Sequence, residues 1–156
     1  MGLLLVGTTA GCHRPAPPGD TSLQIAIERR PCFGGCPVYR LTVLGNGDLT
    51  YEGIRFVARE GTVNDRIAAD LVTKLAAEFK AVRFDTLADR YVDGEPTCPM
   101  HTEDAPTVIT SITSPGLTKR VQHDQGCTGV PTLLTRIENR IDEVVESWRW
   151  TTGRKP

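Results

Sequence analysis

The sequence predicts an α+β domain in which an antiparallel sheet carries two helices on one face. Short alternating segments separated by turn signals predict hairpins, and hairpins pair antiparallel strands. Two longer segments carry apolar residues at helical spacing along one side only, so each helix must bury that side against a sheet. The expected order is strand, strand, strand, helix, an irregular stretch, strand, strand, helix. At 156 residues the chain is long enough for one such domain.

The first half of the domain is expected to hold three strands. Alternation of apolar residues predicts them over 23–30, 38–44 and 49–57. The turn Gly45-Asn46-Gly47-Asp48 joins the last two, because Asn-Gly is a strong hairpin signal. Gly53 inside the third strand predicts a bulge or a bend.

The first helix is expected over 65–80. Asn64 or Asp65 is suited to cap its N-terminus. An apolar stripe recurs every four residues along it, formed by Ile67, Leu71, Leu75 and Phe79.

The second half begins with a less regular stretch over 81–106. The β-branched segment Thr107–Ser114 predicts a strand, Pro115-Gly116 turns the chain, and Leu117–His123 pairs back. Pro131 suits the first turn of the second helix. The stripe of this helix is Leu134, Ile137, Ile141, Val145 and Trp148.

The N-terminal residues indicate export. Residues 1–12 place a short apolar run before small residues and end in Ala10-Gly11-Cys12, which resembles a bacterial lipobox with Cys12 as the lipidated residue. The alternative is a buried or frayed N-terminal segment with an incidental cysteine. Residues 13–22 are Pro-rich and predict a tether, which leaves 23–150 as the folded domain. No apolar run reaches membrane-spanning length, so membrane attachment would come from lipid alone.

Four cysteines remain, an even number that in an exported chain predicts two disulfides. Three connectivities are possible. We favour Cys32–Cys36, within one tight loop, and Cys98–Cys127, which flank the second hairpin. Loop-closure entropy predicts roughly 2 kcal/mol from the short loop and roughly 3–4 kcal/mol from the long one.

Composition excludes some functions. The net charge of −1 comes without a basic stripe, which argues against nucleic-acid binding. Motifs for serine hydrolases, zinc proteases and phosphate-binding loops do not occur, so the sequence predicts no catalytic residue and no cofactor and favours a non-enzymatic protein.

The segment Cys-Phe-Gly-Gly-Cys-Pro-Val-Tyr (32–39) resembles the C-F-G-x-C-P-x-Y signature of a bacterial family known only as a domain of unknown function, whose members often look like lipoproteins. The resemblance covers about 23–147 and implies no activity. Its other matches are Gly47–Gly53, Asp104-Ala105-Pro106, Lys119-Arg120-Val121 and Ile141-Asp142.

Two hypotheses from different classes follow. The first is a lipid-anchored, non-catalytic module of the cell envelope that binds a protein partner through an exposed patch including Phe33 and Tyr39. The second is an extracytoplasmic redox or metal-binding protein. It would use the Cys32/Cys36 loop, or His101 and His123, which a Cys98–Cys127 bridge would draw together.

Overall fold

The computed structural model describes residues 20–155. The predicted signal segment, Cys12 and most of the tether therefore lie outside the described residues. The described chain forms an α+β domain with one seven-stranded sheet, in the order β4-β3-β2-β1-β6-β7-β5. Its strands are β1 (Gln24–Arg29), β2 (Val38–Leu44), β3 (Asp48–Arg55), β4 (Gly61–Arg66), β5 (Arg90–Tyr91), β6 (Thr107–Ser114) and β7 (Leu117–Asp124). Its helices are α1 (Ala69–Ala81), the 3-10 turn η1 (Phe84–Thr86), α2 (Thr132–Val145) and α3 (Trp148–Thr151).

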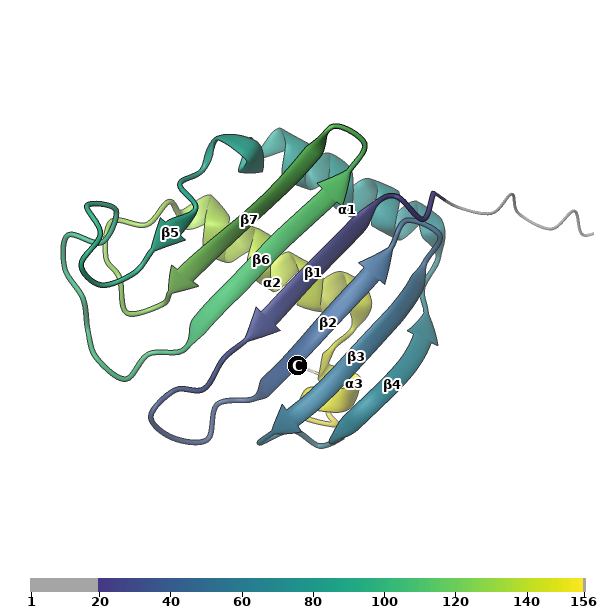
Figure 1. The fold of residues 1–156 in the computed structure, drawn as a ribbon. Helices are drawn as coiled ribbons and strands as arrows, with labels where there is room; N and C mark the ends of the chain where they lie inside the picture. The colour runs from purple at the N-terminus through teal and green to yellow at the C-terminus, as the bar shows by residue number, and fades with distance from the viewer. Residues whose placement is uncertain (1–19, 156) are drawn as a thin grey trace, which may run out of the picture.

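The prediction of a purely antiparallel sheet was wrong, because the sheet is mixed. Five neighbouring pairs are antiparallel, but the short edge strand β5 runs parallel to β7. The predicted order also lacked β4 and β5. The expected one-sided arrangement is present: Figure 1 shows α1 and α2 crossing behind the same face of the sheet, with the other face open.

Strand β4 replaces the predicted start of the first helix. It pairs with β3 from Asp48 opposite Arg66 to Gly53 opposite Gly61. The proposed caps Asn64 and Asp65 are therefore strand residues, and α1 begins only at Ala69.

The later start of α1 also changes its buried stripe. Val72, Leu75 and Phe79 are buried, whereas Leu71 is 37% exposed. Ile67 precedes the helix and packs at the edge of the core. The predicted stripe was therefore right at two of its four positions.

Helix α2 follows the prediction more closely. Pro131 is its N-cap residue, and the four predicted apolar positions from Leu134 to Val145 are buried. The helix ends where Glu146 takes a left-handed conformation with φ 54°. Trp148 therefore falls in α3 instead of α2, and Trp150 is the buried tryptophan, stacked at 5.1 Å on the Tyr51 ring.

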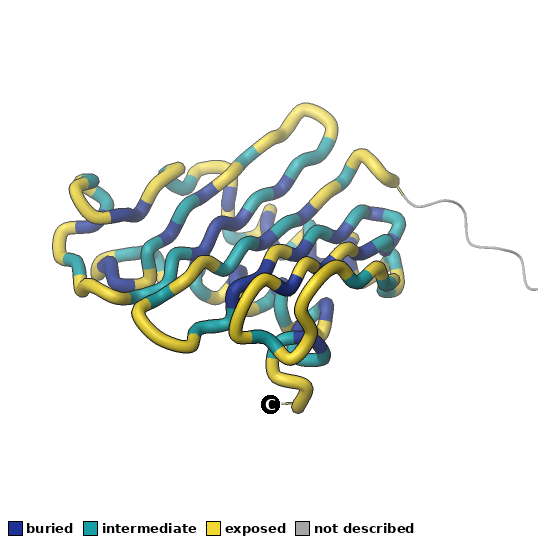
Figure 2. Tube along the Cα trace, turned by 60° about the horizontal axis from the view of Figure 1, so that its bottom comes forward, coloured by how far each residue is buried: buried dark blue, intermediate teal, exposed yellow. Residues whose placement is uncertain are grey.

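The core lies between the sheet and the helices. Along β1, β2 and β3, buried residues alternate with exposed or half-buried ones, as Figure 2 shows by colour. The open face is polar, and Arg40 there pairs with Glu52 at 3.0 Å. An antiparallel sheet tolerates one solvated face in this way. None of the helices in residues 20–155 has the length and hydropathy needed to cross a membrane.

Candidate functional site

Three loops meet at one end of the sheet, where β1 and β7 finish and β2 and β6 begin. Arg30 donates its backbone N–H to Thr107 O at 2.9 Å, and Phe33 donates to Asp104 O at 3.2 Å. A further backbone bond joins Thr102 N–H to Gly126 O at 3.0 Å. We call this surface, formed by residues 30–37, 98–107 and 124–128, the loop end.

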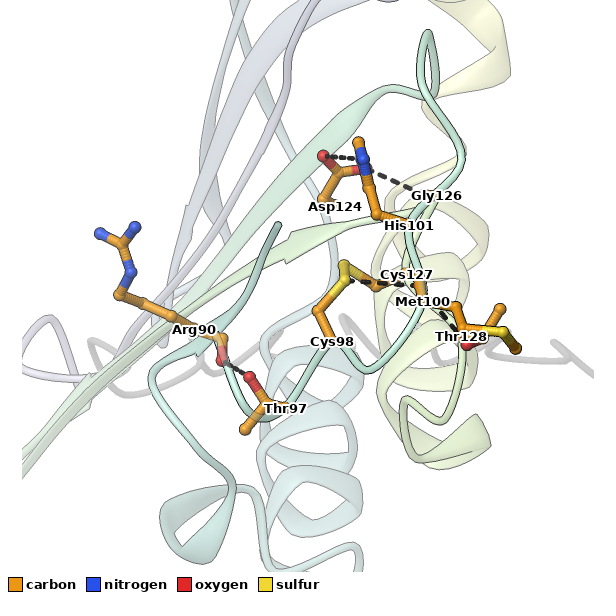
Figure 3. Close-up of a disulfide and its surroundings, with 9 residues drawn as sticks. All are labelled: Arg90, Thr97, Cys98, Met100, His101, Asp124, Gly126, Cys127 and Thr128. Atoms are coloured by element: carbon orange, nitrogen blue, oxygen red, sulfur yellow. Dashed lines mark hydrogen bonds and ion pairs between the residues drawn. A yellow bond between two sulfur atoms is a disulfide. The ribbon is translucent and has the colours of Figure 1, made fainter. Parts of the chain in front are cut away.

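Both disulfides brace the loop end, in the pairing that the sequence favoured. The short disulfide joins Cys32 to Cys36, and the long disulfide joins Cys98 to Cys127. They differ in accessibility: Cys98 and Cys127 are only 7% and 9% exposed, whereas the cysteines of the short disulfide are half-buried. Figure 3 shows the long disulfide beside Met100, whose backbone carbonyl oxygen lies 3.6 Å from Cys98 Sγ.

The two aromatic residues proposed for a binding patch lie in different environments. Phe33 is 86% exposed at the tip of the short disulfide loop. Tyr39 is only 3% exposed, because it faces the helices from β2, so the expectation of a patch with both rings exposed was wrong. The second large apolar side chain exposed at the loop end is Met100, at 67%.

The Tyr39 hydroxyl takes part in a network that ties β1 and β2 to α2. It donates to Asp142 Oδ1 at 2.5 Å and accepts from Arg29 Nε at 3.0 Å. Arg29 also donates to Asp142 Oδ2, from Nε at 2.9 Å and from Nη2 at 2.7 Å. Two of these three residues, Tyr39 and Asp142, belong to the motifs that suggested a family resemblance.

Burial and charge shift the pKa values in this network. Desolvation, together with the neighbouring Asp142 carboxylate, raises the pKa of Tyr39 well above its usual range. Burial opposes the charge on Arg29, but Asp142 and Tyr39 more than offset it, so the pKa of Arg29 is also raised. Tyr39 therefore stays a neutral donor and Arg29 a cation, which is the state that the hydrogen bonds require.

A groove of about 610 Å³ borders this network and is lined by Arg29, Pro37, Tyr39, Asp142 and Trp148 among others. The three polar side chains already satisfy one another. This network therefore stabilises the packing of α2 on the sheet, and we assign it no catalytic role.

The two histidines do not form the expected pair. His101 Nε2 lies 3.0 Å from Asp124 Oδ2, as Figure 3 shows. His123 Nδ1 lies 2.9 and 3.1 Å from the two carboxylate oxygens of Glu138 on α2. His123 and Asp124 are consecutive in β7 and so point to opposite faces of the sheet, which separates the two contacts.

Glu138 was not among the residues predicted from the sequence, although its spacing gave a signal. It lies four residues after Leu134 and three before Ile141, and so falls on the buried stripe of α2. A carboxylate at such a position requires a partner inside the core. Among residues 20–155, no group of three or more histidine, cysteine, aspartate or glutamate side chains is arranged to hold a metal ion.

Comparison with known proteins gives one family and no named function. No curated protein and no solved structure matches the chain. A family model, described as a domain of unknown function (DUF6438), matches residues 23–145, a span that includes both disulfides, Tyr39 and Asp142. The chain therefore belongs to the DUF6438 family.

Proposed function

We propose that this protein is an exported, lipid-anchored domain of the bacterial cell envelope that binds a protein partner through its loop end and catalyses no reaction. Export rests on the lipobox-like end of residues 1–12, with Cys12 as the acylated residue. Two disulfides support it, because disulfides persist mainly in oxidising compartments.

The observation that carries the binding role is the exposure of Phe33 on a covalently closed loop. A large apolar side chain that is 86% exposed gains nothing for the fold. The short disulfide restricts the loop around it, which lowers the entropy lost when a partner orders that side chain. Aromatic residues presented in this way are common binding anchors.

The position of the loop end supports the same proposal. The described chain enters at the opposite end of the sheet. There Gly45 donates its backbone N–H to Leu23 O at 2.8 Å, and its Cα packs against the backbone of Asp20. Strand β1 then runs the length of the sheet to the loop end (Figure 1). A lipid anchor before residue 20 would therefore leave the loop end free to meet a partner away from the anchor.

Site-specific photocrosslinking in cells tests this proposal. A photoreactive phenylalanine analogue replaces Phe33 in one strain. In the control strain it replaces Leu117, the exposed first residue of β7, which follows the β6–β7 turn at the opposite end. We expect a discrete crosslinked envelope protein from position 33 and none from position 117. Equal crosslinking from both positions, or none from position 33, would contradict the proposal.

One observation favours a second candidate, in which the short disulfide exchanges with a partner dithiol. Cys32 and Cys36 are half-buried, whereas the long disulfide is nearly inaccessible, and exposed disulfides are the more readily reduced. Mild reduction followed by alkylation separates the two candidates. Selective labelling of Cys32 and Cys36 in folded protein, with a trapped mixed disulfide in a Cys36→Ser variant, would support exchange; resistance of both disulfides would support the binding module.

A further inference from the structure

The turn between β3 and β4, residues 54–59, exposes two large apolar side chains at one edge of the sheet. Ile54 is 40% exposed and Phe56 is 50% exposed. The turn lines neither the groove of about 1050 Å³ between α1 and α2 nor the groove beside Tyr39. Figure 1 shows it at the same end of the sheet as the β1–β2 loop. Its apolar side chains are therefore presented on a projecting turn and not inside a groove.

Phe56 has a backbone conformation that is unfavourable for an aromatic residue. Its φ is 55°, in the left-handed region that bulky side chains rarely adopt. Two backbone hydrogen bonds to α3 fix the turn, from Ala58 N–H to Thr151 O at 2.8 Å and from Arg59 N–H to Trp150 O at 2.9 Å. Glycine would adopt this φ without the cost, and a half-exposed ring returns little burial energy. Folding therefore does not account for the ring, and strain of this kind is typical of functional positions.

Two arginines flank the ring in the sequence. The Arg55 guanidinium lies over the Phe56 ring, 4.9 Å from its centroid. Arg59 follows three residues later, and both arginines are exposed. Neither forms an ion pair with any of the described residues. The carboxylate beside them in the sequence is Glu60, which is also exposed.

The C-terminal residues add a third cation beside the turn. A Cβ at Gly153 would lie 3.5 Å from the Ala58 Cβ, so Arg154 follows directly on a residue that contacts the turn. Arg154 is exposed and pairs with no carboxylate in residues 20–155. Asp65 of β4 is neutralised by Arg149 at 2.9 Å. The turn and its surroundings are therefore locally cationic, although the whole chain has a net charge of −1.

We propose that the β3–β4 turn is a contact site for an anionic lipid surface. Ile54 and Phe56 would enter the boundary between the headgroups and the acyl chains, and the three arginines would pair with lipid phosphates. Burial of apolar side chains and attraction to anionic headgroups are the two contributions that hold a protein at a bilayer surface. The turn offers both within six residues.

This contact goes beyond the proposed partner binding and uses no residue of the loop end. It would orient the domain with β4 toward the membrane. Neighbouring strands lie about 4.8 Å apart, so β7, five strands along the sheet from β4, would stand about 24 Å further from the membrane. The loop-end segments that adjoin β7 would thus remain accessible to a protein partner.

Co-sedimentation with lipid vesicles tests the site. The protein is the full chain with Cys12→Ser, so that it carries no acyl group, and both disulfides are formed. One set of vesicles contains phosphatidylcholine alone, and the other contains equal parts of phosphatidylcholine and phosphatidylglycerol. We expect binding to the anionic vesicles that weakens as salt is added, and much weaker binding to the neutral vesicles. Equal binding to both sets, or binding to neither, would overturn the proposal.

The variant Phe56→Gly separates a role in binding from a role in folding. It should lower the partition onto anionic vesicles at least about tenfold, because the ring no longer leaves water. Its melting temperature should stay unchanged or rise, because glycine adopts the left-handed φ without strain. Leu117→Ser removes an exposed apolar side chain of β7 and should leave the partition unchanged. A Phe56→Gly protein that binds like the wild type would overturn the proposal, whatever its melting temperature.

A double arginine variant gives a second test that leaves the backbone unchanged. Arg55→Gln with Arg59→Gln should lower the partition roughly 25-fold, about fivefold for each arginine removed. Arg120→Gln with Arg136→Gln makes the same charge change at exposed positions of β7 and α2, and should alter the partition less than about twofold. Residues 1–12 are the same in every variant, so the comparison reports on the turn. Equal losses from the two double variants would show that only net charge matters and would contradict a site at the turn.

Discussion

Replacing Asp142 with alanine is expected to destabilise the domain far more than removal of an exposed ion pair. The change leaves the Arg29 guanidinium and the Tyr39 hydroxyl without their shared acceptor. Breaking a buried ion pair from one side costs about 3–5 kcal/mol. Because the side chains of Arg29 and Asp142 keep 18% and 19% exposure, we expect a smaller loss, about 2–3 kcal/mol of unfolding free energy.

Urea unfolding of the oxidised protein, followed by circular dichroism, measures this loss. The control is Glu52→Ala, which removes the half-exposed Arg40–Glu52 pair and should change stability by less than about 0.5 kcal/mol. Replacing all three network residues with apolar ones (Arg29→Met, Tyr39→Phe, Asp142→Leu) should recover part of the loss, because no buried charge is then left unpaired. An Asp142→Ala cost below about 1 kcal/mol, close to that of the control, would mean that the network does not stabilise the contact between the sheet and α2.

The remaining predictions concern stability. Serine replacement of both Cys98 and Cys127 should cost roughly 3–4 kcal/mol, against roughly 2 kcal/mol for the same change in the short disulfide, when measured by urea unfolding. Burial, with a smaller effect from Asp142, raises the pKa of Tyr51 to about 12. The stability that Tyr51 contributes is thus fully present below pH 10 and is lost as pH rises from 10 toward 12, which thermal melts over that range will detect. Glu146→Gly should raise stability by about 0.5–1 kcal/mol in the same melts, because Glu146 adopts φ 54° at the end of α2.

The sequence predicted those parts of the fold that depend on local signals. Both central hairpins, the position of α2 and the pairing of the cysteines follow from turns, periodicity and spacing. Strand β4 did not follow, because Asn64 and Asp65 are as typical of a helix cap as of a charged edge strand. Strand β5 has only two residues and is defined by its parallel neighbour β7, which no local pattern reveals.

At the candidate sites, too, contacts between distant parts of the chain could not be predicted from local signals. The contact between Arg29 and Asp142 joins residues 113 positions apart and depends on how α2 lies across the sheet. Tyr39 was expected at the surface because it lies beside the short disulfide loop, but strand alternation turns it to the core. The same alternation points His123 and Asp124 to opposite faces of the sheet. Because His101 contacts Asp124, it does not meet His123, although both histidines are close in sequence to the long disulfide.

Export, lipid anchoring and the two disulfides are tested most directly by non-reducing peptide mapping by mass spectrometry on the protein isolated from its native membrane fraction. We expect an acylated N-terminal peptide that begins at Cys12, with Cys32 joined to Cys36 and Cys98 joined to Cys127. An N-terminal peptide that retains Met1 and an unmodified Cys12, together with free thiols at the other four positions, would contradict export, lipid anchoring and the covalently closed loop end.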